Sequence, residues 1–250
     1  SACRPSSSAT SPRSPTTRST RPATKRPVSY NRVFTRGSEK SGNARADQLL
    51  HQGIRKLEVG LYDEAIAFFD RAIHIVPKHD TAYYNRGLAY WRKQDEFAAF
   101  RDYSEVLKLK PNDADALNNR GKIYVLQLRF LDAITDYTRA IDIAYPLYVR
   151  PIDGTNVVVD QEVSGDDTFA IYTIELATLL TNRGNVFNRL GNRAGAIKDF
   201  NDSISIDSKF VKAYVDRGRL FLQMRDFERA LEDCSKALEL NSNNPDARKC

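Results

Sequence analysis

Side chains capable of acid, base or metal chemistry are common in this sequence, but they form no catalytic pattern. The histidines His51, His74 and His79 lack a histidine partner four residues away, and no cysteines have the Cys-x-x-Cys spacing of a zinc site. No phosphate-binding glycine motif is present. The carboxylates recur at regular intervals, which is typical of scaffold residues rather than of one acid–base pair. We therefore expect no enzymatic activity, no metal and no cofactor.

The side chains recur because the chain is repetitive. Two markers share one register, since an alanine follows each glycine of the series after twelve residues. The glycines are separated by 34, 34, 63 and 34 residues, and they are Gly53, Gly87, Gly121, Gly184 and Gly218. The sequence therefore contains five units of one repeat, with extra material between the third and the fourth.

Aromatic residues complete the pattern of the units. They stand three residues after four of the glycines and four residues after four of the alanines. This spacing and period resemble the tetratricopeptide repeat family, and the matched units cover 170 of the 250 residues. Apolar residues at three- and four-residue intervals predict two amphipathic helices in each unit, which must stack on neighbours to bury their apolar faces. The resemblance implies an all-α fold, a right-handed α-solenoid of stacked helix-turn-helix repeats with one long insertion.

The repeat register sets the expected domain boundaries. We expect a repeat domain at 44–250, with units at about 46–79, 80–113, 114–147, 177–210 and 211–244 and an insertion at about 147–176. Within the insertion, Asp153-Gly154 predicts a turn and Val157 to Val159 favour an extended run. The next helix should begin early, near Asp166 or Asp167. The insertion is either a surface excursion or a functional loop that closes over a binding groove or docks a partner.

The N-terminal segment, residues 1–43, is expected to be disordered because it is rich in Ser, Thr, Pro and Arg. Residues 1–38 carry eight basic side chains and no acid, which leaves 30 basic against 32 acidic residues elsewhere. The folded domain is thus nearly neutral and should not bind nucleic acid, although RNA binding through the tail is a remote alternative. No apolar run is long enough to span a membrane. We expect a soluble, cytoplasmic protein; the alternatives are organelle targeting through this segment, or export and lipid anchoring at Cys3.

An arginine and an aspartate recur together in four of the five units. When each unit is numbered so that its glycine is position 8, arginine occupies position 7 and aspartate position 23, whereas the first unit has Gln52 and Phe68 there. Because the two residues are present together and absent together, we expect an ion pair between the two helices of each unit. The predicted pairs are Arg86 with Asp102, Arg120 with Asp136, Arg183 with Asp199, and Arg217 with Asp233.

A series of polar side chains near the glycines is the candidate binding site. The resemblance implies that position 6 faces a concave groove and binds the backbone of a peptide. A carboxamide suits this role because it offers a donor and an acceptor to any extended chain. The alternative is that these amides bond neighbouring helices or water. Position 6 holds Asn85, Asn119, Asn182 and Asp216, and the other expected groove residues are Tyr84, Lys122, Asn185, Arg189, Lys212 and Arg219.

Protein binding is the function that this surface favours. The groove should change from apolar near the first unit to polar and mildly basic near the fourth and fifth, which suits a segment with an apolar end and an acidic end. The expected ligand is an extended or helical segment of another protein. The alternative is a structural protein that self-assembles into a homo-oligomer through its C-terminal end.

The C-terminal residues resemble the start of a further unit. Asn244-Pro245-Asp246 predicts another first helix, of which the sequence holds only the beginning. Solenoids normally close with a polar capping helix, so a truncated chain, self-association or a partner helix is expected at this end. The three cysteines do not make a disulfide framework, and Cys234 stands at a helix-packing position, where we expect a small core residue rather than a reactive one. Three leucines should be partly uncovered: Leu231, Leu238 and Leu240.

Overall fold

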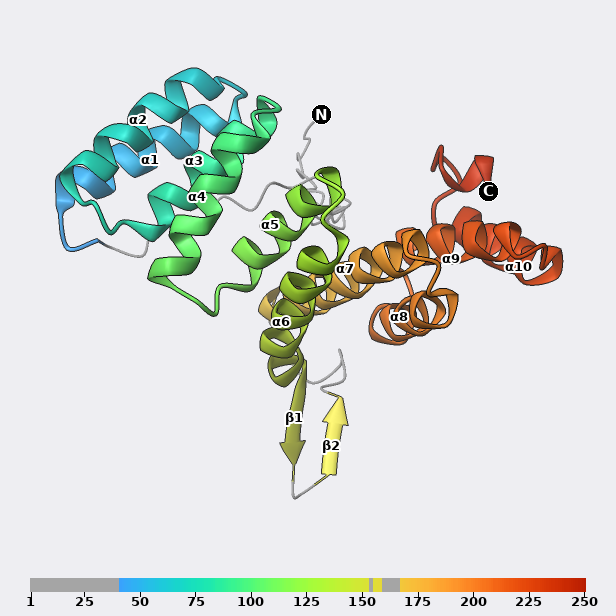
Figure 1. The fold of residues 1–250 in the computed structure, drawn as a ribbon. Helices are drawn as coiled ribbons and strands as arrows, with labels where there is room; N and C mark the ends of the chain where they lie inside the picture. Colours follow the sequence, from blue (N-terminus) through green and yellow to red (C-terminus); the bar gives the residue numbers. More distant parts are fainter. Residues whose placement is uncertain (1–40, 153–154, 159–166) are drawn as a thin grey trace, which may run out of the picture. The chain divides into compact units, whose positions relative to one another are not determined.

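The computed structural model describes residues 41–152, 155–158 and 167–250, which form ten α-helices, a β-hairpin and a short 3-10 helix (Figure 1). All of these elements lie within one compact unit, Thr35–Cys250. The helices are α1 (Ala44–Glu58), α2 (Tyr62–Ile75), α3 (Asp80–Arg92), α4 (Glu96–Leu109), α5 (Ala114–Leu126), α6 (Phe130–Tyr148), α7 (Asp167–Arg189), α8 (Arg193–Ile206), α9 (Val211–Gln223) and α10 (Phe227–Leu240). The strands are β1 (Val149–Ile152) and β2 (Thr155–Val158), and η1 (Ala247–Lys249) follows α10.

The helices pack in sequence order. Within each unit the first helix packs against the second, as α1 does on α2 and α9 on α10. Each second helix then packs against the first helix of the next unit, as α2 does on α3 and α8 on α9. Contacts between neighbouring units of this kind are the architecture of an α-solenoid. The fold class predicted from the repeat is therefore confirmed.

A recurrent turn joins the two helices of each unit. The residue at position 15 has a positive φ, which is easy for Gly60 and Gly191 but strained for an L-residue such as Leu128, at 58°. The next residue usually caps the second helix, because its side chain accepts a hydrogen bond from a free backbone amide of the first turn. Asp95 accepts from Ala98 N at 3.0 Å in this way. These local signals explain why the second helices begin where they do.

The centre of each of the first four units is a close contact between a glycine and an aromatic ring. A Cβ on any of these glycines would lie 2.5–3.0 Å from a ring carbon, so only glycine allows the ring to approach this closely. The rings are at most 2% exposed. The contacts are Gly53 with Phe69, Gly87 with Tyr103, Gly121 with Tyr137, and Gly184 with Phe200.

The insertion begins with a β-hairpin. α6 continues through Pro146 to Tyr148, so this proline does not end the helix. The helix tolerates it because a proline near a helix end removes only one backbone hydrogen bond. β1 and β2 pair antiparallel, with Val149 opposite Val158. The predicted turn at Asp153-Gly154 and Val159 lie outside the described residues. α7 begins at Asp167, as the sequence indicated.

The residues after α10 fold back onto the last unit, which corrects two expectations. Cys234 is buried as predicted, but it forms a disulfide with Cys250. The predicted helix is only the short turn η1, whose Ala247 is 2% exposed. Leu231 is 69% exposed, whereas Leu238 and Leu240 pack against an apolar cluster that includes Ala247.

Candidate functional site

The predicted arginine–aspartate pairs join the two helices of four units. In each pair the guanidinium donates through Nε and Nη2 to the two carboxylate oxygens, at 2.7–2.8 Å. This two-bond geometry is the strongest form of such a pair. The carboxylates are buried, and the arginine side chains are only 17–20% exposed. The pairs, Arg86–Asp102, Arg120–Asp136, Arg183–Asp199 and Arg217–Asp233, therefore face the protein interior rather than a ligand.

Three of the four arginines, Arg86, Arg183 and Arg217, also bond the preceding unit, a contact that the sequence reasoning missed. Nη1 of Arg86 donates to Asp70 at 2.6 Å, and Nη1 of Arg183 donates to Thr138 at 3.1 Å. The signal was present, because position 25 is polar in each of the first four units: Asp70, Ser104, Thr138 and Asn201. Polarity alone is not sufficient, since Oγ of Ser104 has no hydrogen-bond partner among the described residues and so does not bond Arg120. Burial alone would lower the pKa of Arg86, but its bonds to Asp102 and Asp70 outweigh burial and raise that pKa. Arg86, Arg183 and Arg217 thus connect neighbouring units as well as the helices of one unit.

Polar side chains on the first helices form a second set of contacts between units. Asn119 donates to the hydroxyl of Tyr84 at 3.2 Å, and Asn182 donates to Asn118 at 3.1 Å. Asn185 donates to Asp216 at 2.7 Å. Each bond joins a first helix to the first helix of an adjacent unit. We call this set the amide face: Tyr84, Asn118, Asn119, Lys122, Asn182, Asn185 and Asp216.

Two of the predicted groove residues are buried. Asn85 is completely buried and donates to the carbonyl of Thr81 at 2.9 Å. Its Oδ1 has no partner among the described residues. The assignment of Asn85 as a peptide ligand therefore needs correction, because its carboxamide is inaccessible in this structure. Tyr84 is 3% exposed and also packs edge-on against the ring of Tyr103.

Lys122 belongs to the amide face through a bond to Asn119. Its ammonium donates to Oδ1 of Asn119 at 3.1 Å, and it makes no ion pair with a described residue. The pKa of Lys122 is lowered to about 8, mainly by burial and also by the charges of Lys212 and Arg92, although the charge of Asp115 opposes this effect. The amide face thus holds a cation that burial has made costly to keep charged.

The remaining predicted groove cations have partners of their own. Lys212 donates to Asp216 at 2.7 Å, and Arg219 donates to Asp246 at 2.8 Å. The guanidinium of Arg189 lies 6.0 Å from the centre of the Phe130 ring, a cation–π contact. These three side chains are more exposed than the arginines of the core pairs, and each already has a partner within the protein.

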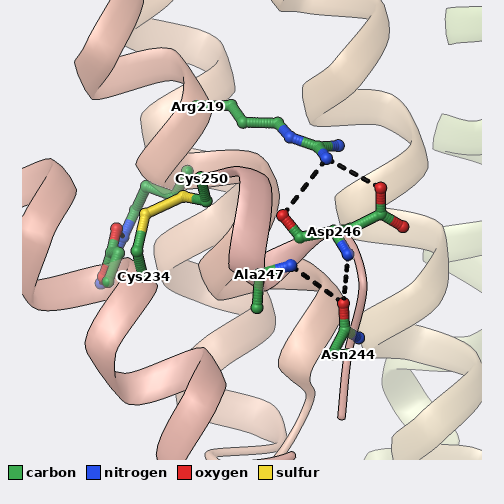
Figure 2. Close-up of a disulfide and its surroundings, with 8 residues drawn as sticks. Arg219, Cys234, Asn244, Asp246, Ala247 and Cys250 are labelled. Atoms are coloured by element: carbon green, nitrogen blue, oxygen red, sulfur yellow. Dashed lines mark hydrogen bonds and ion pairs between the residues drawn. A yellow bond between two sulfur atoms is a disulfide. The ribbon is translucent and has the colours of Figure 1, made fainter. Parts of the chain in front are cut away.

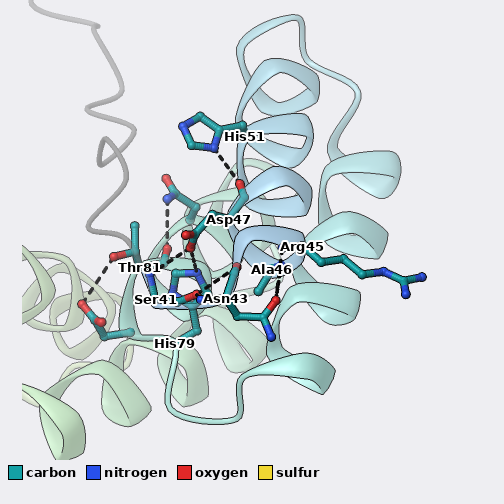
Figure 3. Close-up of polar contacts among 10 residues, drawn as sticks. Ser41, Asn43, Arg45, Ala46, Asp47, His51, His79 and Thr81 are labelled. Atoms are coloured by element: carbon teal, nitrogen blue, oxygen red, sulfur yellow. Dashed lines mark hydrogen bonds and ion pairs between the residues drawn. The ribbon is translucent and has the colours of Figure 1, made fainter.

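A buried histidine lies at the start of α3 (Figure 3). His79 is 2% exposed, and its Nε2 is 3.7 Å from Oδ1 of Asp47 on α1, too far for a hydrogen bond. That carboxylate instead accepts from the backbone amide of Ser41 at 2.9 Å. Burial lowers the pKa of His79, although the charges of Asp47 and Asp80 oppose this effect. Burial therefore favours the neutral form of this imidazole.

The described residues contain neither a metal-binding cluster nor a membrane-spanning helix. No group of three or more His, Cys, Asp or Glu side chains among them could hold a metal ion. None of the described helices combines the length and the apolar character that a membrane span requires.

Comparison with known protein families places the repeats. Tetratricopeptide repeat models match residues 57–94, 80–113, 177–210 and 211–244, which together make half of the chain. Human tetratricopeptide repeat protein 6 is 30% identical over 191 residues, which cover 73% of this chain and 36% of that protein. Stress-induced-phosphoprotein 1 of Caenorhabditis elegans is 23% identical over 190 residues, covering 72% of this chain and 58% of that protein. The chain thus spans between a third and three fifths of these relatives.

Solved structures with the same fold are more distant in sequence. MamA of Desulfovibrio magneticus RS-1 is 17% identical with a TM-score of 0.63, covering 81% of this chain and 98% of that one. YrrB, described as a TPR protein with an unusual peptide-binding site, is 18% identical with a TM-score of 0.57, covering 82% and 90%. At these identities the likeness concerns the fold alone. The family models, which match half of the chain, show that it belongs to the tetratricopeptide repeat family, and the packing of the helix pairs agrees with them.

Proposed function

We propose that the chain binds an extended segment of a partner protein along the amide face, and that Lys122 pairs with an acidic side chain of that segment. Protein binding in general follows from the family, because a tetratricopeptide repeat array is a protein-interaction scaffold. The choice of the amide face and of an acidic ligand side chain rests on one observation: Lys122 bonds a neutral carboxamide and forms no ion pair with a described carboxylate.

The electrostatics of Lys122 favour an anionic ligand. Moving an ammonium away from water costs free energy unless an opposite charge offsets it, and the lowered pKa of Lys122 reflects that cost. A carboxylate brought by a ligand would add its negative charge to that of Asp115 and raise this pKa again. Arg92 and Lys212 carry the same positive charge as Lys122 and lower its pKa, so they would also attract the acidic group.

The carboxamides supply the neutral part of the surface. Asn119, Asn182 and Asn185 are each partly exposed, and each donates one N–H group to an adjacent unit. These bonds fix the orientation of the amides before a ligand arrives, which lowers the entropy cost of binding. A carboxamide has a second N–H group and an acceptor oxygen, so capacity remains for the backbone of an extended peptide.

A peptide-display selection on the full chain tests the proposal. Random peptides are selected on the wild type, on Lys122→Gln and on Lys209→Gln, which removes an equal charge from an exposed turn. We expect the wild type and Lys209→Gln to enrich peptides with Asp or Glu at one fixed position, and Lys122→Gln to lose that preference. Failure to enrich any peptide, or the same acidic preference in all three proteins, would contradict the proposal.

A further inference from the structure

The fifth unit departs from the other four at its central contact. In the first four units an aromatic ring lies against the glycine of the first helix, but Cys234 replaces that ring in the fifth. A Cβ on Gly218 would lie 3.0 Å from Sγ of Cys250 and 3.1 Å from Sγ of Cys234. The disulfide therefore occupies the space that an aromatic ring fills elsewhere in the protein.

One of the two sulfurs comes from outside the unit. Cys250 follows η1, and Figure 2 shows how the segment 244–250 returns to α10 so that the two cysteines meet. The same segment places Ala247 in an apolar cluster with Val211, Tyr214 and Val215. The segment thus covers apolar side chains of the fifth unit.

The disulfide is the strongest attachment of this segment. η1 has three residues, too few to be stable as an isolated helix. The ion pair between Arg219 and Asp246 is exposed, with 40% and 61% of the side chains accessible, so it contributes little. Asn244 accepts from the amides of Asp246 and Ala247, but these bonds lie within the segment itself. Arg248 donates to the carbonyl of Ser242 at 2.9 and 3.2 Å and to Oδ1 of Asn243 at 3.1 Å, but these bonds are exposed. Apart from the disulfide, the segment is therefore held on the unit by exposed polar contacts and by the burial of Ala247.

We propose that Cys234–Cys250 is a redox site, opened by a dithiol reductant, whose state decides whether the segment 244–250 covers the end of the fifth unit. This site is separate from the amide face and does not depend on the proposed peptide binding. The oxidised form keeps the apolar cluster covered, and the reduced form releases the segment and exposes it.

The exposure of the two cysteines sets the order of the reaction. Cys234 is 7% exposed whereas Cys250 is more accessible, so a reductant thiolate attacks Sγ of Cys250. The S–S bond breaks, a mixed disulfide forms at Cys250, and the Cys234 thiolate leaves and takes up a proton. The second thiol of the reductant loses its proton and attacks the reductant sulfur of the mixed disulfide. This step closes a disulfide within the reductant and releases Cys250, which takes up a proton and becomes a thiol. Two electrons pass from the dithiol, now a disulfide, to the two cysteines.

Hydrogen exchange on the full chain, with and without dithiothreitol, tests the proposal. Peptide mapping of the non-reduced protein should first identify the Cys234–Cys250 linkage. Reduction should then raise the exchange rate of residues 241–250 at least about tenfold and also increase exchange in α9. Cys250→Ser should show the fast exchange without reductant, and Cys3→Ser should respond to reductant as the wild type does.

The proposal also has a control for misfolding and clear adverse outcomes. Far-UV circular dichroism of Cys250→Ser should equal that of the wild type, since α9 and α10 do not require the linkage to form. Absence of the Cys234–Cys250 linkage after air oxidation would overturn the proposal. Equal exchange of residues 241–250 in the oxidised and reduced proteins would overturn it as well.

Discussion

Removing Arg183 alone should destabilise the protein far more than removing Arg183 and Asp199 together. The carboxylate of Asp199 is 2% exposed and receives two bonds from this guanidinium, both at 2.8 Å. In Arg183→Met the carboxylate would be left buried without its charge partner. Breaking a buried pair typically costs about 3–5 kcal/mol. Because the arginine is 17% exposed and water can reach the vacated space, we expect about 3 kcal/mol, at the lower limit of that range.

The double variant Arg183→Met with Asp199→Leu removes both charges and fills the space with apolar atoms. Replacement of a whole buried pair in this way is often neutral, so the double variant should lie within about 1 kcal/mol of the wild type. The first unit is a natural precedent, because it folds with Gln52 and Phe68 at these positions. Arg193→Met removes an exposed arginine at the start of α8 and should change stability by no more than about 0.5 kcal/mol.

Urea denaturation followed by far-UV circular dichroism measures these differences, with the midpoint and the slope fitted for each variant. The expected loss for Arg183→Met corresponds to a decrease in melting temperature of roughly 6–12 °C. The reasoning would be refuted if Arg183→Met were as stable as Arg193→Met. It would fail equally if the double variant were as unstable as the single one, since the cost would then not arise from an unpaired charge.

Three further variants test individual features by the same denaturation assay. Tyr103→Phe should raise stability by about 1 kcal/mol, because the buried hydroxyl has no hydrogen-bond partner among the described residues; a loss would indicate a partner. Leu128→Gly should stabilise by about 0.5–1 kcal/mol, because glycine relieves a φ of 58°, and no gain would argue against strain in that turn. Burial lowers the pKa of His79 below its ordinary value of about 6.5, so the unfolded chain binds more protons and stability should fall as pH decreases below about 6.5. His79→Gln should reduce this pH dependence, and an unchanged dependence would mean that His79 does not cause it.

The fold could be predicted because the sequence repeats its own constraints. Each unit places a glycine opposite an aromatic ring, and the interval between glycines gives the period and the position of the insertion. The arginine–aspartate geometry was accessible for a related reason. Both residues are missing from the same unit, which points to direct contact without any alignment of homologues.

The burial and the hydrogen-bond partners of individual polar side chains could not be predicted from the repeat. Asn85, Asn119 and Asn182 occupy the same position of their units, yet only Asn85 is completely buried. Their partners differ because the neighbouring residues differ: Asn119 bonds a tyrosine hydroxyl, whereas Asn182 bonds another asparagine. Such differences depend on packing between units, which the spacing of residues does not determine.

The disulfide was missed for a similar reason. Cys234 alone resembles a small core residue, and its partner lies 16 residues away in a segment whose path the repeat does not specify. The sequence did contain one hint, since Cys234 stands where four other units carry an aromatic ring. The loss of a large side chain beside Gly218 required another group to fill that space, and Cys250 provides it.

The affinity of an acidic peptide for the full chain is the most direct test of the proposed function. A peptide enriched by the display selection is titrated calorimetrically against the wild type, Lys122→Gln and Lys209→Gln, together with a twin peptide in which its acidic residue is replaced by the amide. Replacing either the lysine or the acidic residue should weaken binding at least about tenfold, or about 1.4 kcal/mol. Because only protonated Lys122 attracts a carboxylate and its pKa is about 8, wild-type affinity should also fall about tenfold between pH 7 and pH 9. Equal affinities for the two peptides, with no loss in Lys122→Gln, would contradict the assignment of Lys122 as the residue that recognises the ligand.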